Sequence, residues 1–216
     1  GEVTMIAGEL ADRLSASPVI PILTVDAPQE AVLASEALVR GGMRTIEITL
    51  RTAGALAAIR AVKSALPSLQ VAAGTVLDAR QMDEALEAGS DFCVSPGLTP
   101  ALLRAASDRG CPLLPGVATA SDVMCGLANG LQVFKLFPAM AIGGVGLLRG
   151  LAGPFPDVRF CPTGGVTPEN MAALLAEPNV VCCGGSWMAS RALIESGDWA
   201  AIERLAAAAC DVRGAS

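Results

Sequence analysis

Short apolar segments rich in β-branched residues alternate with helix-type patterns along the whole chain. Eight segments predict strands: Val19–Val25, Thr45–Leu50, Gln70–Val76, Phe92–Ser95, Pro112–Val117, Gln132–Phe137, Arg159–Thr163 and Val180–Gly184. These segments are nearly all apolar and show little alternation, which is typical of parallel strands covered on both faces. The pattern therefore predicts a parallel sheet enclosed by helices.

Caps and prolines predict where the intervening helices begin and end. After the first strand, Asp26 is the expected N-cap, Pro28 lies in the first turn and Gly41 ends the helix. Thr99 and Thr167 each precede a proline, which is the pattern of a cap followed by proline at the first helical position. The connections between strands and helices are therefore short.

Eight strand–helix units with short connections predict an α/β fold, a parallel (β/α)8 TIM barrel preceded by one extra helix at roughly Met5–Ala16. The alternative is a doubly wound open sheet. That fold requires a G-x-G-x-x-G turn after the first strand, where the chain reads LTVDAPQE. No linker or low-complexity tract interrupts the 216 residues, so a single domain over residues 1–216 is expected.

Charge and hydropathy exclude two classes of partner. The net charge is −6 and no basic cluster occurs, so nucleic acid is not an expected partner. Mean hydropathy is high at +0.53, but no uninterrupted apolar run reaches the ~20 residues of a membrane span. The N-terminus, GEVTMIAGELADRL, lacks the basic start and apolar centre of a signal peptide. We therefore expect a soluble cytoplasmic protein.

The absence of histidine limits the possible chemistry. The chain has no histidine, and its 7 cysteines include no C-x-x-C pair. This composition argues against zinc and iron–sulfur sites, and it removes Ser-His and Cys-His catalysis. We therefore expect no metal, and chemistry that proceeds without imidazole.

Two charged residues lie inside predicted buried strands. They are Lys135 in VFKLF and Glu47 in IEITLRT, whereas the other lysine, Lys63, is expected on the exposed face of an outer helix. A buried structural ion pair is one explanation, but its desolvation penalty often cancels its attraction. Inward-facing charged groups near the C-terminal ends of barrel strands are more often functional. We interpret Lys135 and Glu47 as catalytic.

Phe134, Leu136 and Phe137 are expected to surround the amine of Lys135 and shield it from water, and a neutral amine is a nucleophile. Such an amine attacks a ketone to form a Schiff base, which permits cleavage or formation of the adjacent C–C bond. Without histidine, Glu47 is the best candidate general acid/base, and the planar fork of Arg51 suits a substrate carboxylate. Further candidates at the C-terminal ends of the predicted strands are Thr75, Ser95, Pro96, Thr163 and Ser186.

Two Gly-Gly pairs follow the last two predicted strands. Gly164 and Gly165 occur in PTGGVTPEN, and Gly184 and Gly185 occur in CCGGSWM beside Ser186. Glycine lets backbone N–H groups approach an anion, and the loops after strands 7 and 8 are the usual phosphate site of this fold. One pair alone could be a tight turn. Two pairs at both positions predict a phosphate site.

The motifs VFKLFPA, IEITLRT, AGTVL, SPGL, CPTGGV and GGSW, in this order and spacing, resemble those of the 2-keto-3-deoxy-6-phosphogluconate (KDPG) and 4-hydroxy-2-oxoglutarate (KHG) aldolases. The resemblance covers essentially the whole chain. It implies a class I aldolase, a lyase of the Entner–Doudoroff pathway that reversibly cleaves KDPG to pyruvate and D-glyceraldehyde 3-phosphate. It also implies a homotrimer, and a covalent lysine imine in place of any metal or other cofactor.

The resemblance assigns roles to individual residues. It implies that Lys135 forms the Schiff base, that Glu47 is the acid/base and that Arg51 holds the carboxylate of pyruvate. It implies substrate contacts at Thr75, Pro96, Phe137 and Thr163, and phosphate binding at Gly164, Gly165, Gly185 and Ser186.

Several alternatives stay open on the sequence alone. Family members also cleave KHG, which lacks the phosphate, to pyruvate and glyoxylate, and related aldolases act on the 6-phosphogalactonate analogue. The chain follows the gluconate pattern at LRT and SPG. A non-catalytic barrel that binds sugar phosphates is a competing hypothesis, although a pure binder has no use for Glu47 and Lys135. A phosphosugar epimerase or isomerase is another, but such enzymes commonly use metal-bound histidines or paired acid/base groups.

Overall fold

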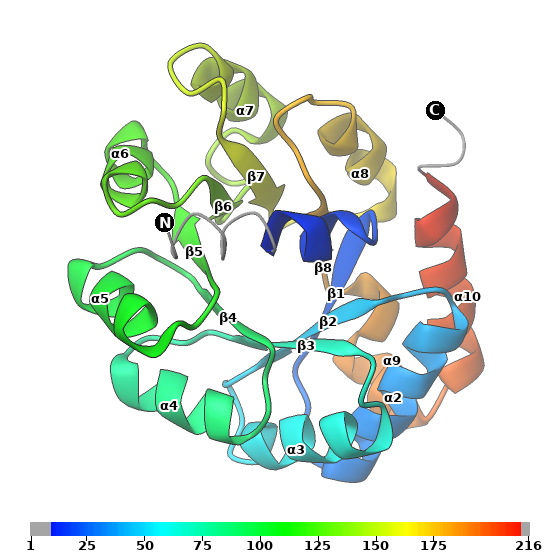
Figure 1. The fold of residues 1–216 in the computed structure, drawn as a ribbon. Helices are drawn as coiled ribbons and strands as arrows, with labels where there is room; N and C mark the ends of the chain where they lie inside the picture. The colour runs from blue at the N-terminus through cyan, green and yellow to red at the C-terminus, as the bar shows by residue number, and fades with distance from the viewer. Residues whose placement is uncertain (1–9, 213–216) are drawn as a thin grey trace.

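The strands form one closed parallel barrel. The computed structural model describes residues 10–212, and Figure 1 looks along the barrel with the helices around its outside. The strands are β1 (Val19–Leu23), β2 (Thr45–Thr49), β3 (Gln70–Gly74), β4 (Phe92–Ser95), β5 (Leu113–Val117), β6 (Val133–Leu136), β7 (Arg159–Pro162) and β8 (Cys183–Gly185). Each pairs with its neighbours in chain order, and β1 pairs with β8. Parallel bridges Phe160↔Val180 and Thr163↔Gly184 close the ring. The predicted (β/α)8 barrel is confirmed, and the open sheet is wrong.

The predicted strand ends differ from the observed ones mainly at the C-terminal side. β1 ends at Leu23 and β3 at Gly74, in each case two residues before the predicted end. Val25 and Val76 are nevertheless buried. The apolar runs therefore continue past the sheet into the first buried residues of the loops, and hydrophobicity alone does not mark the end of the strand.

Helices follow the strands around the barrel, and proline and glycine mark their ends. They are α2 (Pro28–Arg40), α3 (Ala55–Ala65), α4 (Ala79–Glu87), α5 (Pro100–Arg109), α6 (Ala120–Ala128), α7 (Gly144–Ala152), α8 (Pro168–Leu175), the 3-10 helix η1 (Trp187–Ala189), α9 (Arg191–Ser196) and α10 (Trp199–Asp211). As predicted, Thr99 and Thr167 are the N-caps of α5 and α8, and Gly41 is the C-cap of α2. Within residues 10–212, no helix has the length and apolar character needed to cross a bilayer.

Two charged residues have roles that differ from the predicted ones. Asp26 does not cap α2, because Ala27 occupies the N-cap position. The Asp26 carboxylate instead accepts a hydrogen bond from the Gly54 N–H at 2.7 Å, which ties the loop after β1 to the start of α3. Lys63 does not lie on an exposed face: its amine pairs with Asp91 at 2.9 Å, and its side chain is 18% exposed. Both residues hold neighbouring loops together.

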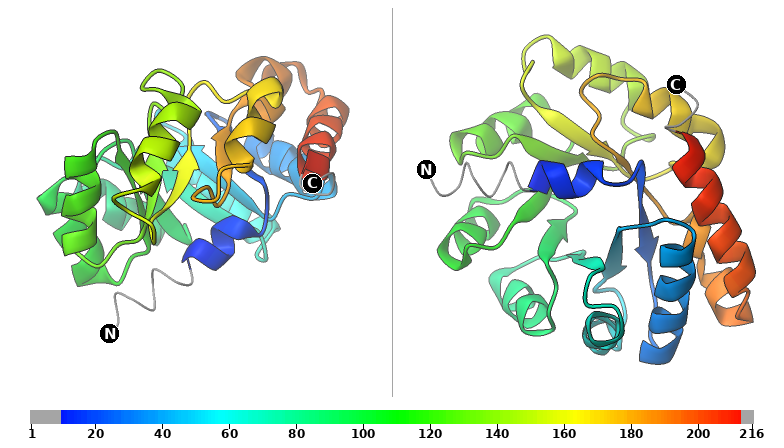
Figure 2. Two further views of the ribbon diagram at one scale, coloured as in Figure 1. Left: turned by 90° about the horizontal axis from the view of Figure 1, so that it is seen from above. Right: turned by 45° about the vertical axis from the view of Figure 1, so that its right-hand side comes forward.

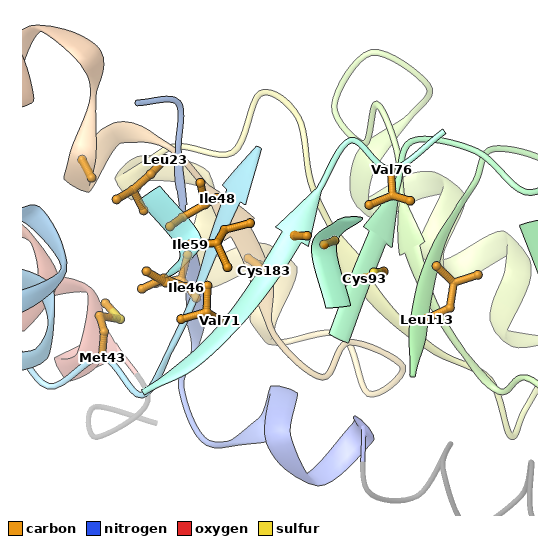
Figure 3. Close-up of a cluster of buried hydrophobic side chains, with 14 of the residues drawn as sticks. Leu23, Met43, Ile46, Ile48, Ile59, Val71, Val76, Cys93, Leu113 and Cys183 are labelled. Carbon is orange, nitrogen blue, oxygen red and sulfur yellow. The ribbon is translucent and has the colours of Figure 1, made fainter. Parts of the chain in front are cut away.

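Alternate residues of each strand face two different apolar layers. The outward residues pack against the helices, and Figure 3 shows part of this layer around Ile46, Ile48 and Val71. The inward residues form a second cluster of Ile20, Ala72, Phe92, Val94, Leu114, Val133, Cys161 and Cys182. Because both faces of the sheet are covered, the strands read as continuous apolar runs.

The segment before β1 closes the lower end of the barrel. Residues 10–15 are helical, and they lie across the ends where the strands begin (Figures 2 and 3). Leu10 and Leu14 belong to the inner cluster and are 3% and 0% exposed. The predicted extra helix is thus confirmed for residues 10–15, and its first part, residues 5–9, lies outside the described residues. Because Leu10 and Leu14 fill the end where the strands begin, the end where the strands finish is the open one.

Candidate active site

Lys135 and Glu47 meet inside the barrel. Ile46 and Ile48 of β2 pack in the outer layer, so Glu47 between them points inward. Lys135 of β6 points inward for the same reason. Its Nζ lies 3.5 Å from Glu47 Oε1, and the two side chains are only 8% and 6% exposed. The two charged residues singled out in the sequence therefore form one buried ion pair, contributed by two strands that are not neighbours.

The ring of Phe137 covers the amine. Lys135 Nζ lies 5.2 Å from the ring centroid, within the range of a cation–π contact. Phe134 and Leu136, which were expected to surround the amine, pack in the outer layer. That expectation was wrong because successive residues of a strand point to opposite faces. The amine is shielded by the barrel interior and by Phe137.

Gly74 makes room for the Glu47 carboxyl group. A Cβ atom at Gly74 would lie 2.7 Å from both Cγ and Cδ of Glu47, closer than real Cβ atoms approach other heavy atoms. The φ angle of Gly74 is not positive, so the glycine is required for space and not for backbone freedom. Sequence reasoning missed this residue. The signal was present, since a glycine inside a strand often marks a close approach.

A cavity of about 420 Å³ opens at the C-terminal ends of β1, β7 and β8. It is lined by Ile22, Thr24, Arg51, Phe137, Thr163, Gly164, Gly165, Val166, Gly184, Gly185, Ser186, Ala189, Ser190 and Arg191. Phe137 both lines this cavity and touches the amine of Lys135. The cavity therefore reaches the Phe137 ring that covers the amine, although Lys135 and Glu47 are not among its described lining residues.

Arg51 is held at the cavity by Thr75. The Arg51 Nε donates a hydrogen bond to Thr75 Oγ1 at 3.4 Å. Among the described residues, Thr75 is the only non-glycine residue with a positive φ, 60°, and such conformations cluster at functional sites. Thr75 and Pro96 do not themselves belong to the described lining of the cavity. Thr75 therefore contacts the cavity only indirectly, through Arg51. The hydroxyl of Ser95, the residue before Pro96, donates a hydrogen bond to the Gly97 carbonyl at 2.7 Å.

The first glycine pair has a backbone that other residues rarely adopt. Gly164 and Gly165 have φ angles of 98° and 75°. A Cβ atom at Gly164 would lie 3.2 Å from Pro138 Cα, and one at Gly165 would lie 2.9 Å from Met140 Cβ. Both conformation and space therefore require glycine here, and both residues line the cavity.

The second glycine pair accommodates two neighbouring side chains. Gly184 leaves room for Thr163, and Gly185 leaves room for the ring of Trp187. Thr163 is buried, and its hydroxyl donates to the Cys161 carbonyl at 3.2 Å. Ser186 is exposed at the cavity. The sequence-predicted candidates on β7 and β8 are thus gathered on one side of the barrel mouth.

Three polar residues of the cavity were missed in the sequence. Thr24 follows β1, and its hydroxyl lies 2.9 Å from that of Thr49. The rule that selected Thr75, a polar residue where an apolar run ends, also applies to Thr24. Ser190 and Arg191 lie beyond η1, at the start of α9, and no motif marks them in the sequence.

The cysteines and acidic residues do not gather into a metal-binding group. Within residues 10–212, no three or more His, Cys, Asp or Glu side chains are arranged to hold an ion. The Cys182 thiol donates a hydrogen bond to Cys161 Sγ at 3.4 Å. A hydrogen bond with Cys111, together with burial, raises the pKa of the Cys93 thiol. That thiol therefore stays protonated and is a poor nucleophile.

The chain matches a family model described as KDPG and KHG aldolase over residues 10–205. A 2-dehydro-3-deoxy-phosphogluconate aldolase of Pseudomonas aeruginosa is 50% identical over 187 residues, which cover 87% of this chain and 85% of the relative. A KHG/KDPG aldolase of Escherichia coli is 48% identical over 193 residues, covering 89% and 91% of the two chains.

The fold is also that of a solved aldolase structure. The KDPG aldolase of Legionella pneumophila, with pyruvate captured at low pH as a covalent carbinolamine intermediate, aligns with a TM-score of 0.91 at 40% sequence identity. The alignment covers 93% of this chain and 97% of that chain.

The space at Gly74 generates a prediction about the position of Glu47. We expect Gly74→Ala to fold normally but to displace the Glu47 carboxyl group, and to lower the turnover rate by about a hundredfold, the scale of loss for a ~1 Å misplacement. Turnover and thermal unfolding are measured beside Gly150→Ala, because a Cβ atom there meets nothing within 4 Å. Equal turnover in the two variants would contradict the positioning role of Gly74.

Proposed function

The chain belongs to the KDPG and KHG aldolase family, and we propose that Lys135 and Glu47 perform its aldol chemistry. It is an aldolase, a lyase that reversibly cleaves KDPG, the Entner–Doudoroff intermediate, to pyruvate and D-glyceraldehyde 3-phosphate. The observation that carries the residue assignment is the 3.5 Å contact between Lys135 Nζ and Glu47 Oε1 inside the barrel. A carboxylate at that distance can take a proton from the ammonium or return one to it.

In the addition step, the neutral amine of Lys135 attacks the C2 carbonyl carbon of the keto acid. The new N–C bond forms as the carbonyl electron pair moves to oxygen, which gives a carbinolamine after proton transfer. Protonation of the hydroxyl by Glu47 lets it leave as water, and the iminium ion remains on Lys135. The low exposure of both side chains, 8% and 6%, keeps bulk water away from these transfers.

In the cleavage step, the carboxylate of Glu47 removes the proton of the C4 hydroxyl. The C3–C4 bond breaks, its electron pair moves to C3 to form an enamine, and C4 becomes the carbonyl of the aldehyde product. Protonation of C3 by Glu47 gives the iminium of pyruvate, and addition of water releases pyruvate and the free amine. Because the iminium nitrogen accepts the electrons, the cycle needs no metal or other cofactor.

The two ends of the substrate are recognised by different groups. We assign the pyruvate carboxylate to Arg51, whose planar guanidinium is oriented by Thr75 at 3.4 Å. Along the carbon chain, we assign contacts to Thr75, Pro96, Phe137 and Thr163. The phosphate is assigned to Ser186 and to backbone N–H groups of Gly164, Gly165 and Gly185, which line the cavity.

The competing hypothesis of a non-catalytic sugar-phosphate binder gives the ion pair no role, and burying two charges is unfavourable unless it serves a purpose.

We further propose that KHG is a second substrate, cleaved to pyruvate and glyoxylate. Its pyruvate half uses the same amine and the same carboxylate. It is shorter than KDPG and has no phosphate for the loops that contain Gly164–Gly165 and Gly184–Gly185 to hold.

We also propose that the single-domain chain assembles as a homotrimer with its small-molecule site in each subunit. Large apolar side chains on α6 support a subunit contact, because Met124 and Leu127, one turn apart, are 61% and 36% exposed. Light scattering should give a mass about three times that of the 21.8 kDa chain. A monomeric mass at micromolar concentration would contradict this assembly.

The Schiff base is tested by trapping. We expect borohydride with pyruvate to give a stable adduct on Lys135, and both Lys135→Ala and Lys135→Arg to abolish trapping and turnover, because a guanidinium stays protonated. Peptide mass spectrometry locates the adduct. Lys63→Arg is the matched control, since it keeps a cation beside Asp91 and should trap normally. Wild-type trapping on Lys63, or turnover in Lys135→Arg, would overturn the assignment. A chelator should leave turnover unchanged.

Ser186→Ala tests the phosphate assignment. Loss of one hydrogen bond to a charged group is worth ~1.5–3 kcal/mol, so kcat/KM for KDPG should fall about ten- to a hundredfold. The loss on unphosphorylated KHG should be much smaller, because KHG has no phosphate to accept the hydrogen bond from Ser186. Ser196→Ala, an exposed serine outside the cavity lining, is the control. Equal losses on both substrates would mean that Ser186 supports the barrel and not the phosphate.

A further inference from the structure

Arg51 and Arg191 are the only charged residues among those described as lining the cavity. The cavity therefore carries two positive charges, in a chain whose net charge is −6. A ligand with two separate anionic groups complements such a surface. If Arg51 holds the carboxylate of the substrate, Arg191 is left facing the second anion.

The orientation of Arg191 leaves most of its donors available. It is the first residue of α9, and its Nε donates to Glu195 Oε1 at 2.6 Å. No other nitrogen of this guanidinium donates a hydrogen bond to a described residue. Since arginine carries five N–H donors, four of them remain available to a ligand while the Nε–H is held by Glu195.

The carboxylates that act on Arg191 lie outside the described lining of the cavity. Glu195, and to a smaller extent Asp26 and Glu30, raise the pKa of Arg191, so the side chain is always charged. None of these three carboxylates lines the cavity. A bound anion therefore meets the guanidinium without meeting a like charge in the wall.

We propose that Arg191 is a second anion-binding side chain of the site. It binds the phosphate group of the substrate together with the loops that contain Gly164–Gly165 and Gly184–Gly185. The inference rests on the proposed function, because it requires a phosphorylated substrate. A planar guanidinium can donate two parallel hydrogen bonds to phosphate oxygens. Backbone N–H groups supply hydrogen bonds but no full charge, whereas a phosphate monoester carries close to two negative charges at neutral pH. Arg191 supplies the missing cation.

An ordinary surface ion pair of the same kind provides the comparison. On α4, Arg80 pairs with Glu84 at 2.6 Å with the same i,i+4 spacing, and its side chain is 68% exposed, against 72% for Arg191. Such pairs contribute little to stability. Arg80 lies outside the cavity lining, so Arg80→Gln removes the same charge from an equivalent pair and is the matched control.

The test compares Arg191→Gln, Arg191→Lys and Arg80→Gln with the wild type. We expect Arg191→Gln to raise the KM for KDPG and the inhibition constant of inorganic phosphate about tenfold, with kcat changed less than threefold. The loss should shrink at high salt, which screens exposed charges. Arg191→Lys, which keeps a positive charge, should recover part of the loss. Arg80→Gln should match the wild type.

The outcomes separate this inference from the proposed function. If Arg191→Gln matches Arg80→Gln on both substrate and inorganic phosphate, while Ser186→Ala loses affinity, the inference is wrong and the phosphate site stands without this arginine. An equal loss in the rate of pyruvate trapping on Lys135 would also overturn it, because pyruvate has no second anionic group and the arginine would then act on the fold. Absence of KDPG cleavage by the wild type would overturn the proposed function itself.

Discussion

The contact between Lys135 and Glu47 lies inside a barrel whose other inward side chains are mostly apolar. Neither charge could be buried alone without a large desolvation penalty, and removing one partner would leave an uncompensated charge. The surrounding structure reflects this constraint. Gly74 keeps the space for the carboxyl group, Phe137 covers the amine, and the segment with Leu10 and Leu14 fills the opposite end. The cavity lies at the other end, the barrel mouth, where Phe137 separates it from the amine.

Chemistry and recognition are placed on different parts of that mouth. The proposed reacting groups come from β2 and β6, in strands whose register is fixed by the sheet on both sides. The proposed phosphate-binding groups lie in the loops after β7 and β8 and at the start of α9, and all of them line the cavity. This division lets loop residues change the affinity for a phosphate without moving the amine. The same division would let the proposed catalytic pair serve substrates that differ in their distal group.

The sequence predicted the barrel well because its strands are covered on both faces and its helices carry proline and glycine at their ends. It predicted the positions of Lys135 and Glu47 because a charge in an apolar strand is conspicuous. It failed where spatial proximity decides the role. Asp26 resembles a cap but bonds to Gly54 across two loops, and Lys63 resembles a surface residue but pairs with Asp91. A glycine inside a strand, such as Gly74, signals a close approach but not which residue approaches, and Arg191 carries no local signal at all. The neighbours of both residues are set by the barrel and not by the adjacent sequence.

Exchange of the pyruvate methyl protons in heavy water, followed by NMR, measures directly whether Glu47 moves protons on a pyruvate bound to Lys135. This reaction needs the imine and the acid/base but neither the phosphate nor C–C cleavage. We predict rapid exchange with the wild type and a rate ~10²–10⁴-fold lower with Glu47→Gln, the usual contribution of a positioned acid/base group. Exchange at the wild-type rate in Glu47→Gln would contradict the proposed acid/base role of Glu47.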